Sequence, residues 1–366
     1  MRIIFIGAAT SNHTIRWVNA LAKRGHNVLL LSRKDQRDEK HCISSDVNIH
    51  YLKYGGGIGY YLNVFEVKKI VKEYKPDVVN AHYATGYGTL ARLSKCKNLV
   101  ISVWGSDIYE FPWIKKSNQR LVCKNLNYAD AIASTSFAMA EETRRVLNNP
   151  SKKITVTPFG VDLQLFYPSL NKTRKENKII GIVKYLEPIY DIPLLINAFE
   201  IIKRKNRNVE LHIYGDGKLK DELVEMCDKK GILNSVHFMG TIPNFEVPNA
   251  LRTMDVFVNC SKQESFGVAI IEAMACKIPV VATDCEGYKE IIDNDNLGIV
   301  ISRRDPELLA SSILYLLDNP SISAKISEKA FEKVCQQYDW EKNVSIMERL
   351  YFDVSKNKSI TGREIL

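Results

Sequence analysis

Short hydrophobic runs alternate with amphipathic segments over residues 1–135. Between the runs, segments such as residues 13–25 and 63–75 carry hydrophobic residues at helical spacing. The strand-like runs are residues 2–7, 27–32, 77–82, 98–103 and 130–134. Strands that are hydrophobic throughout and separated by helices are typical of a parallel sheet with helices on both faces. The pattern therefore predicts a doubly wound α/β domain.

The alternation stops at residues 157–178, a segment rich in proline and lysine, and then starts again. The second series has strand-like runs at residues 178–183, 209–215, 235–240, 255–260 and 279–284. We predict two Rossmann-like domains facing a central cleft that the carboxyl ends of both sheets line. The expected division is an N-terminal domain at 1–165, a linker at 166–177, a C-terminal domain at 178–338, and an amphipathic helix within 339–366 that crosses back to the first domain.

The composition is that of an ordinary globular protein. Hydrophobic residues make up 45% and charged residues 25% of 366 positions, and this length suits two domains. No stretch approaches the roughly 20 apolar residues of a membrane-spanning helix, and the apolar run after Met1 is too short for a signal peptide. The eight cysteines are scattered and the histidines do not cluster, so we expect no disulfide framework, no metal site and a cytoplasmic location.

Basic residues are concentrated in the first half of the chain. Residues 1–170 carry 24 Lys and Arg against 13 Asp and Glu, a net charge of +11, whereas the remainder carries 27 against 29, a net charge of −2. This asymmetry indicates an anionic partner for the first half, either a membrane surface or an acidic ligand. The alternative is a basic face that only keeps the domain soluble. The segment Tyr109–Lys116 mixes aromatic and basic residues as membrane-surface segments do.

Two glutamates frame a Phe-Gly pair in the second half of the chain. Glu264 lies in a polar loop after a predicted strand, and Glu272 lies about five residues into the next helix. At about 1.5 Å per residue, Glu272 is roughly 8 Å along the helix axis from Gly267, which suits an elongated ligand. Backbone N–H groups at Gly267 and Val268 would favour a phosphate, and the carboxylates would accept hydrogen bonds from hydroxyl groups. The alternative is a helix-capping glutamate and a second glutamate that reaches solvent.

The sequence around these glutamates reads NCSKQESFG, then EAMA, then PVVATD. It resembles the signature of the retaining, nucleotide-sugar-dependent glycosyltransferases of family four, which is roughly Pro-Ser-x-x-Glu-Ser/Gly-Phe-Gly, Glu-Ala-Met-Ala and Pro-Val-Val-Ala-Thr. Further counterparts are RGHNVLLLS, PFGVDLQLFYP, IYGDGKLKDEL, VHFMGTIPNFEV and YDWEKN, so the resemblance covers nearly the whole chain. It implies the GT-B fold, with the nucleotide sugar held mainly by the C-terminal domain and the acceptor mainly by the N-terminal domain.

The resemblance assigns donor-binding roles within this motif. Glu264 would hydrogen-bond hydroxyl groups of the donor sugar, and Glu272 would hydrogen-bond the ribose. Backbone N–H groups that would meet the sugar and the diphosphate belong to Phe266, Gly267 and Val268.

The resemblance also implies a basic pair that neutralises the diphosphate. Lys184 takes the first position of this pair, but the second position, five residues later, is Ile189. A missing cation should weaken stabilisation of the departing diphosphate unless another basic residue replaces it, because such electrostatic contributions are worth about 3 kcal/mol each. The predicted catalytic residues are His82, Lys184 and Glu264.

In the first domain, His82 lies where a predicted strand ends, and the family commonly has a histidine there near the donor sugar. The alternative is a histidine that is satisfied by its own domain. The segment SVWGSDIY ends the next strand, so Asp107 should also face the cleft and is a candidate acceptor-binding residue. Ser11, Asn12 and His13 either contact the acceptor or cap the first helix. Their loop lacks the G-x-G-x-x-G fingerprint, which argues against a hydride-transfer enzyme.

The resemblance implies transfer of a sugar from a nucleoside diphosphate sugar to a hydroxyl group, with retention at the anomeric carbon. A UDP-sugar is favoured over a GDP-sugar, with no cofactor and no metal. The favoured acceptor is a lipid-diphosphate-linked or polysaccharide intermediate of bacterial surface glycan synthesis, which would bring the protein to the inner face of the cell membrane. Nucleic acid is not expected as a partner. The alternatives are a GT-B-fold nucleotide-sugar epimerase or hydrolase, and a non-catalytic partner subunit, which Ile189 suggests.

Overall fold

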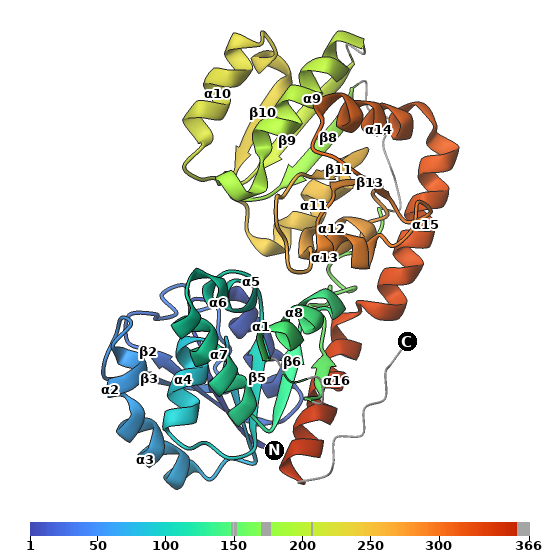
Figure 1. Cartoon of the computed structure of the whole chain (residues 1–366). Helices are drawn as coiled ribbons and strands as arrows, with labels where there is room; N and C mark the ends of the chain where they lie inside the picture. The colour runs from blue at the N-terminus through green and yellow to red at the C-terminus, as the bar shows by residue number, and fades with distance from the viewer. Residues whose placement is uncertain (148, 150–151, 170–176, 206–207, 357–366) are drawn as a thin grey trace. The chain divides into compact units, whose positions relative to one another are not determined.

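The hydrophobic runs form the strands of two parallel sheets, each with helices on both faces (Figure 1). The computed structural model describes residues 1–147, 149, 152–169, 177–205 and 208–356. The chain divides into unit 1, which comprises Met1–Pro158 and Asn343–Leu366, and unit 2, which comprises Phe159–Lys342. Both units have the doubly wound α/β architecture that the sequence pattern predicts.

Unit 1 contains a seven-stranded sheet in the order β3-β2-β1-β4-β5-β6-β7, in which all neighbours are parallel. Its elements are β1 (Arg2–Ile6), α1 (Asn12–Lys23), β2 (Asn27–Arg33), β3 (Val47–Leu52), α2 (Gly59–Leu62), α3 (Val64–Tyr74), β4 (Val78–His82), α4 (Gly86–Leu93), β5 (Leu99–Val103), α5 (Ser106–Tyr109), α6 (Phe111–Ile114), α7 (Lys116–Tyr128), β6 (Ala131–Ser134), α8 (Phe137–Leu147) and β7 (Ile154–Val156). The strand order reverses between β1 and β4, which makes the carboxyl ends of these two strands a topological switch point.

Unit 2 contains a six-stranded parallel sheet in the order β10-β9-β8-β11-β12-β13. Its elements are β8 (Lys178–Val183), η1 (Pro188–Tyr190), α9 (Ile192–Lys205), β9 (Val209–Tyr214), α10 (Lys220–Lys229), η2 (Leu233–Ser235), β10 (Val236–Gly240), η3 (Asn244–Glu246), α11 (Val247–Arg252), β11 (Val256–Asn259), α12 (Val268–Ala275), β12 (Val280–Thr283), α13 (Glu286–Ile291), β13 (Ile299–Ile301), α14 (Pro306–Asp318) and α15 (Pro320–Gln337). Here the strand order reverses between β8 and β11.

Side-chain alternation along the strands builds a core on each face of a sheet. On β1, Ile4 and Ile6 join a buried cluster with residues of α3, α4 and α7. Phe5 points to the opposite face, as successive strand residues do, and its ring lies 6.4 Å from the ring of Tyr351 on the last helix. Because both faces are covered, a strand such as β1 is hydrophobic at every position after its first residue.

The last helix, α16 (Trp340–Ser355), belongs to unit 1 from Asn343 onwards. Tyr351 is fully buried, and its hydroxyl accepts a hydrogen bond from the Asn80 side chain on β4. Glu348 pairs with the guanidinium of Arg24 and with Nε2 of His26, the latter at 2.7 Å. A buried tyrosine, an ion pair with Arg24 and a hydrogen bond with His26 therefore anchor α16 to unit 1.

The predicted linker lies partly outside the described residues, which omit 170–176. Its described beginning packs on unit 2. The Arg252 guanidinium stacks over the Tyr167 ring at 3.9 Å and donates to the backbone carbonyls of Leu165 and Tyr167. Among the described residues, the structure contains no helix that is long and apolar enough to span a membrane.

Candidate functional site

In unit 2, the loops that follow β8 and β11 diverge at the switch point, and ligands of open parallel sheets bind at such positions. Lys184 follows β8 directly, and Glu264 lies in the loop after β11. Although 80 residues separate them, Lys184 Nζ donates to Glu264 Oε2 over 2.5 Å. The side chains are 13% and 20% exposed, so the pair is largely desolvated but reachable by a ligand. The fold thus unites two predicted site residues in one ion pair.

Two buried residues hold the Glu264 carboxylate in place. Ser261 Oγ and the Tyr288 hydroxyl lie 3.4 and 3.3 Å from its Oε2, and Tyr288 also donates to Ser261 Oγ over 2.7 Å. Burial and the nearby Glu264 charge raise the pKa of Tyr288 well above its usual value, so this hydroxyl keeps its proton. The sequence prediction missed Tyr288, which carries no motif signal of its own.

The Phe-Gly pair shapes the start of α12. Gly267 has a φ of +103°, and a Cβ at this position would come within 2.9 Å of the Tyr288 ring, so only glycine fits. The side chain of Phe266 is buried against Phe159 and Tyr338, with ring centroids 6.1 and 5.4 Å away. Phe266 can therefore meet a ligand only through its backbone, which is the role predicted for it.

The beginning of α12 has the properties of an anion site. Val268 is its first helical residue, and N–H groups in the first turn of a helix have no acceptor within that helix. The helix dipole adds partial positive charge there. Glu272 is the fifth residue of α12 and is partly buried. The distance along the helix between Gly267 and Glu272 is therefore the one that the sequence predicted. Contact of a ligand with either residue stays a prediction.

Arg304 is a further basic residue at this edge of the sheet that the sequence analysis did not single out. Its guanidinium pairs with Asp191, two residues after Ile189, and donates to the carbonyls of Cys260 and Ser261. Ile189 itself is 38% exposed, and its carbonyl accepts a hydrogen bond from the Lys262 N–H. Arg304 thus links the loop that contains Ile189 and Asp191 to the loop that follows β11 and contains Glu264.

Ile189→Lys should tighten binding of a nucleoside diphosphate roughly fivefold, about 1 kcal/mol, because a new ammonium at a partly exposed position gains only a moderate charge interaction. Titration calorimetry at low salt measures this, with Ile189→Gln as the uncharged control. Equal affinities of the Lys variant and the unmodified protein would mean that a residue such as Arg304 already supplies the second positive charge.

In unit 1, His82 ends β4 at the switch point and is 1% exposed. Its Nδ1 lies 3.2 Å from Thr14 Oγ1, while its Nε2 has no hydrogen-bond partner within the described part of the chain. The Trp104 ring covers it at 4.1 Å. Burial and the neighbouring His13 hold the pKa of His82 well below its usual value. A neutral imidazole with an unused nitrogen can hydrogen-bond a hydroxyl group, and contact between His82 and the donor sugar stays a prediction.

The residue after His82 is conformationally unusual. Tyr83 has a φ of +71°, in the left-handed region that residues other than glycine rarely adopt. Such strain is concentrated at functional sites, where the surrounding structure enforces it. The Tyr83 ring lies 5.6 Å from that of Trp104. His82, Tyr83, Trp104 and His13 therefore form one aromatic cluster at the carboxyl ends of β4 and β5.

Asp107 forms hydrogen bonds with backbone N–H groups of this region. It is 1% exposed, and its carboxylate accepts hydrogen bonds from the N–H groups of Ala84, Trp104 and Gly105 at 2.8, 3.1 and 2.9 Å. Its oxygens thus stabilise the turns after β4 and β5. The structure shows a positioning role for Asp107, and direct contact with an acceptor stays a prediction.

The loop after β1 contains the other acceptor candidates. The side chain of Ser11 accepts a hydrogen bond from the Thr14 N–H at 3.5 Å and caps α1, which is one of the two predicted roles. Asn12 is exposed. The ring of His13 lies 5.2 Å from that of Trp104. Contact of Ser11, Asn12 or His13 with an acceptor stays a prediction.

Unit 1 should lose stability as the pH falls from 6.5 to 4. Burial, with a smaller effect of Arg16, lowers the pKa of His13 from 6.5 to about 4. Below pH 6.5 the unfolded state therefore binds a proton that the folded state rejects, which lowers the unfolding free energy by a total of about 3 kcal/mol at pH 4. In His13→Gln, the slope of the unfolding free energy against pH should be smaller by about 1.4 kcal/mol per pH unit.

Tryptophan fluorescence during urea unfolding measures this change, because Trp17, Trp104 and Trp113 all lie in unit 1. The control is His50→Gln, which alters a surface histidine paired with Glu66. A pH slope that is the same in His13→Gln and the unmodified protein would exclude His13 as the titrating group.

Comparison with known proteins agrees with this architecture. The family profile "Glycosyl transferases group 1" matches residues 167–333, and "Glycosyl transferase 4-like" matches residues 2–136. Sucrose-phosphate synthase from Thermosynechococcus elongatus superposes with a TM-score of 0.85 at 19% identity, over 98% of this chain and 100% of that one. Anabaena HepE in complex with UDP superposes with a TM-score of 0.80 at 20% identity, over 97% of this chain and 100% of that one.

The two Rossmann-like units define the GT-B class of glycosyltransferases, so the predicted fold class is confirmed. The chain belongs to the family-four type of these glycosyltransferases. It is 33% identical over 297 residues to the poly(ribitol-phosphate) alpha-N-acetylglucosaminyltransferase of Staphylococcus aureus. The match covers 79% of this chain but 57% of that relative, so the chain spans little more than half of its length.

Proposed function

We propose that this protein transfers a hexosyl group from a UDP-sugar to a hydroxyl group of a bacterial surface glycan intermediate, with retention at the anomeric carbon. The observation that carries the proposal is the Lys184–Glu264 pair at the switch point of unit 2, beside the start of α12. Crystals of HepE contain UDP-glucose, and the name of the S. aureus relative specifies transfer of alpha-N-acetylglucosamine. The first supports a UDP-hexose donor, and the second supports transfer of a hexose-type sugar.

In the proposed reaction, the bond between the anomeric carbon and the diphosphate oxygen breaks, and the acceptor oxygen bonds to that carbon from the same face. The acceptor proton passes to the departing diphosphate. Lys184 and the first N–H groups of α12 would neutralise the negative charge that develops on the diphosphate. Glu264 would orient the sugar hydroxyls and Glu272 the ribose, so that protein groups mainly position the reactants and stabilise charge.

A panel of nucleotide sugars tests the proposal. At about 100 times its dissociation constant, the cognate donor should add about 2.7 kcal/mol of stability, which thermal denaturation detects. NMR of the reaction with that donor and a mixture of glycan acceptors should show a glycoside of the donor's own anomeric configuration. An inverted product would refute retention. Free sugar formed as fast as glycoside would favour a hydrolase or epimerase, and failure to bind any donor would favour a non-catalytic subunit.

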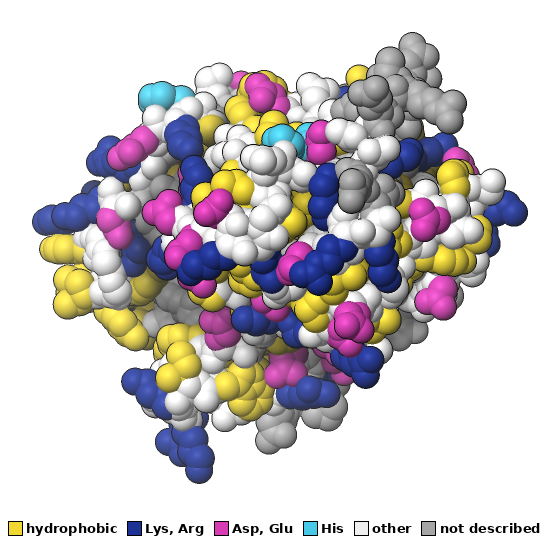
Figure 2. Space-filling model, turned by 90° about the horizontal axis from the view of Figure 1, so that it is seen from above, with side chains coloured by type: hydrophobic (Ala, Val, Ile, Leu, Met, Phe, Trp, Pro, Cys, Tyr) yellow, Lys and Arg dark blue, Asp and Glu magenta, His cyan; other side chains and the backbone are white. Residues whose placement is uncertain are grey.

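A lipid-linked acceptor would require contact with the membrane surface. Exposed hydrophobic side chains of unit 1 run from Ile58, which directly precedes α2 and is 65% exposed, to Phe65 on α3, which is 81% exposed. On α6, Trp113 and Ile114 are also exposed and precede two lysines. On the one face drawn in Figure 2, basic and acidic side chains are interspersed. The membrane proposal rests on these exposed segments and on the net charge of residues 1–170.

The protein should therefore sediment with anionic liposomes at low salt and be released as salt rises, since each basic residue near the surface contributes about 1 kcal/mol and screening removes it. Trp113→Ala, the double variant Lys115→Ala and Lys116→Ala, and Phe65→Ser should each bind at least fivefold more weakly. Phe245→Ser is the control, because Phe245 is 65% exposed in unit 2. If the unmodified protein ignores anionic liposomes at low salt, a soluble acceptor is the better hypothesis.

A further inference from the structure

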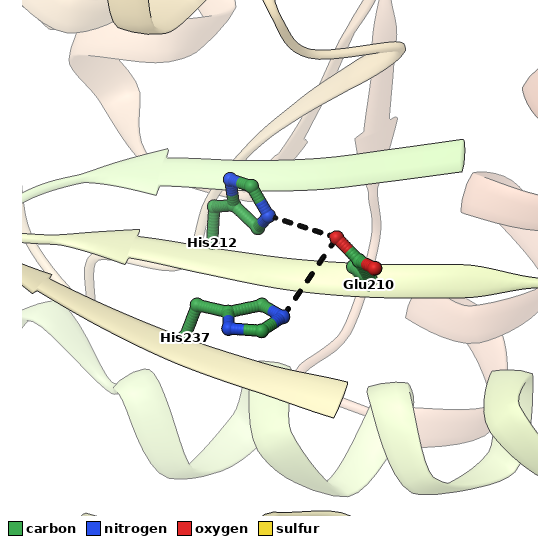
Figure 3. A group of neighbouring side chains, drawn as sticks. All are labelled: Glu210, His212 and His237. Atoms are coloured by element: carbon green, nitrogen blue, oxygen red, sulfur yellow. Dashed lines mark hydrogen bonds and ion pairs between the residues drawn. The ribbon is translucent and has the colours of Figure 1, made fainter. Parts of the chain in front are cut away.

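Two histidines and a glutamate meet on the sheet of unit 2, although the sequence gives no sign of a histidine cluster. Glu210 and His212 lie on β9, and His237 lies on the edge strand β10 (Figure 3). Glu210 and His212 are two positions apart and therefore share a face of the strand. The strand register pairs His237 directly with His212. Parallel pairing thus brings together three side chains that are distant in the sequence.

These side chains point away from the main core of the unit. The alternate residues of β9, which are Val209, Leu211 and Ile213, belong to the buried cluster that α9 and α14 complete. On the opposite face, the side chains of His212, Glu210 and His237 are 14%, 29% and 43% exposed. The cluster is therefore partly desolvated but open on one side.

The distances suit a bound metal ion. His212 Nε2 and His237 Nε2 lie 3.2 and 3.7 Å from the same carboxylate oxygen, Glu210 Oε2. All three ligand atoms lie within 4.8 Å of one another. Bonds of about 2.0–2.1 Å in a tetrahedral zinc site place its ligand atoms about 3.3 Å apart. A small inward rotation of His237, the most exposed of the three, would complete this geometry.

A fourth residue orients the carboxylate. Asn177 Nδ2 donates to the other oxygen, Glu210 Oε1, over 2.7 Å. This hydrogen bond leaves Oε2 turned toward both imidazoles, and outer partners of this kind commonly fix metal-ligating groups. A glutamate carboxyl is ordinarily ionised at neutral pH, as a metal ligand must be.

We propose that Glu210, His212 and His237 bind one Zn²⁺ ion, with water at the remaining position. Imidazole and carboxylate ligands together suit zinc, whereas magnesium and calcium require oxygen ligands. The ion would join β10 to β9 and stabilise the sheet edge. The three ligands lie within β9 and β10, whereas Lys184 and Glu264 lie in the loops after β8 and β11, so the proposed zinc ligands are not residues of the donor site.

Titration calorimetry of the full chain with Zn²⁺ at neutral pH, in a Cys42→Ser background that removes the exposed thiol, tests the proposal. One ion should bind per chain. His212→Gln and His237→Gln should each weaken binding at least 100-fold, and Asn177→Ala should weaken it about 10-fold. His50→Gln should have no effect, because His50 forms a similar surface pair with Glu66 but has no third ligand beside it among the described residues. Substitution with Co²⁺ should produce visible absorption bands that His237→Gln abolishes.

Thermal denaturation shows whether a variant has lost zinc binding or has lost its folded stability. Saturating Zn²⁺ should raise the Tm of the unmodified protein and of His50→Gln but not that of His237→Gln, whose Tm without metal should match the unmodified protein. His237 is the safest ligand to replace, because it is the most exposed. Zinc affinity that is the same in His237→Gln and His212→Gln as in the unmodified protein would overturn the proposal, and so would the absence of any 1:1 binding.

Discussion

Lys184→Ala is expected to lower kcat/KM for the nucleotide sugar by roughly 10²–10³-fold, the usual effect of removing one group that stabilises charge in a transition state. Lys184 is largely buried at the carboxyl end of β8, where its charge is poorly screened. The variant would also leave Glu264 without its cationic partner. Lys184→Arg keeps the positive charge and should recover part of the activity. Steady-state kinetics with the cognate donor measures both variants.

The matched control for this experiment is Lys178→Ala. Lys178 begins the same strand and forms a similar ion pair, with Asp255 Oδ1 at 3.0 Å, but at the amino end of the sheet. Its removal should leave kcat/KM within about twofold of the original value, because partly exposed ion pairs contribute little. Equal losses in the Lys178 and Lys184 variants would indicate a general loss of structure and would contradict a role for Lys184 in stabilising the diphosphate.

Glu272→Ala and Glu264→Ala should separate binding of the nucleotide from transfer of the sugar. If Glu272 holds the ribose, its loss removes hydrogen bonds to a charged group and should weaken UDP binding about 10-fold or more. If Glu264 holds the sugar, Glu264→Ala should bind UDP as well as the unmodified protein, or slightly better because the Lys184 ammonium is released. Its rate of transfer should nevertheless fall at least 100-fold.

Titration calorimetry with UDP and kinetics with the complete donor make the comparison. Glu286→Ala is the control, since Glu286 is an exposed glutamate on the next helix whose only described ion pair is with Lys289. Neither UDP affinity nor transfer should change in it. Similar losses of UDP affinity in the Glu264 and Glu272 variants would show that the assigned roles are wrong.

The buried strands could be predicted from the sequence, whereas three strands were missed. Runs such as residues 2–7 and 178–183 became β1 and β8 because strands covered on both faces are hydrophobic at nearly every position. β3 at the sheet edge reads VNIHYL, with only its two ends buried. β7 and β13 have three residues each and also lie at edges. A strand that is only partly buried, or that has only three residues, contains too few hydrophobic residues in a row to be recognised from the sequence.

The donor motif could be recognised because its residues are close in the sequence. Glu264, Gly267 and Glu272 lie within one loop and one helix, so their relative positions follow from local geometry alone. The partners of Glu264 are different. Tyr288 reaches it from α13, and Lys184 reaches it from the loop that follows β8, and no local spacing indicates such contacts.

The sequence by itself determined the class of the fold, the position of the glutamate motif and the absence of a basic residue at position 189, because local periodicity and short motifs encode these features. Only the tertiary structure decided which distant side chains meet. It placed Arg304 beside the loop of Ile189, buried His82 beneath Trp104, and aligned His237 with His212 across two strands. The physical reason is that strand order and register are set by packing over the whole sheet, and they bring together side chains whose separation along the chain carries no sign of contact.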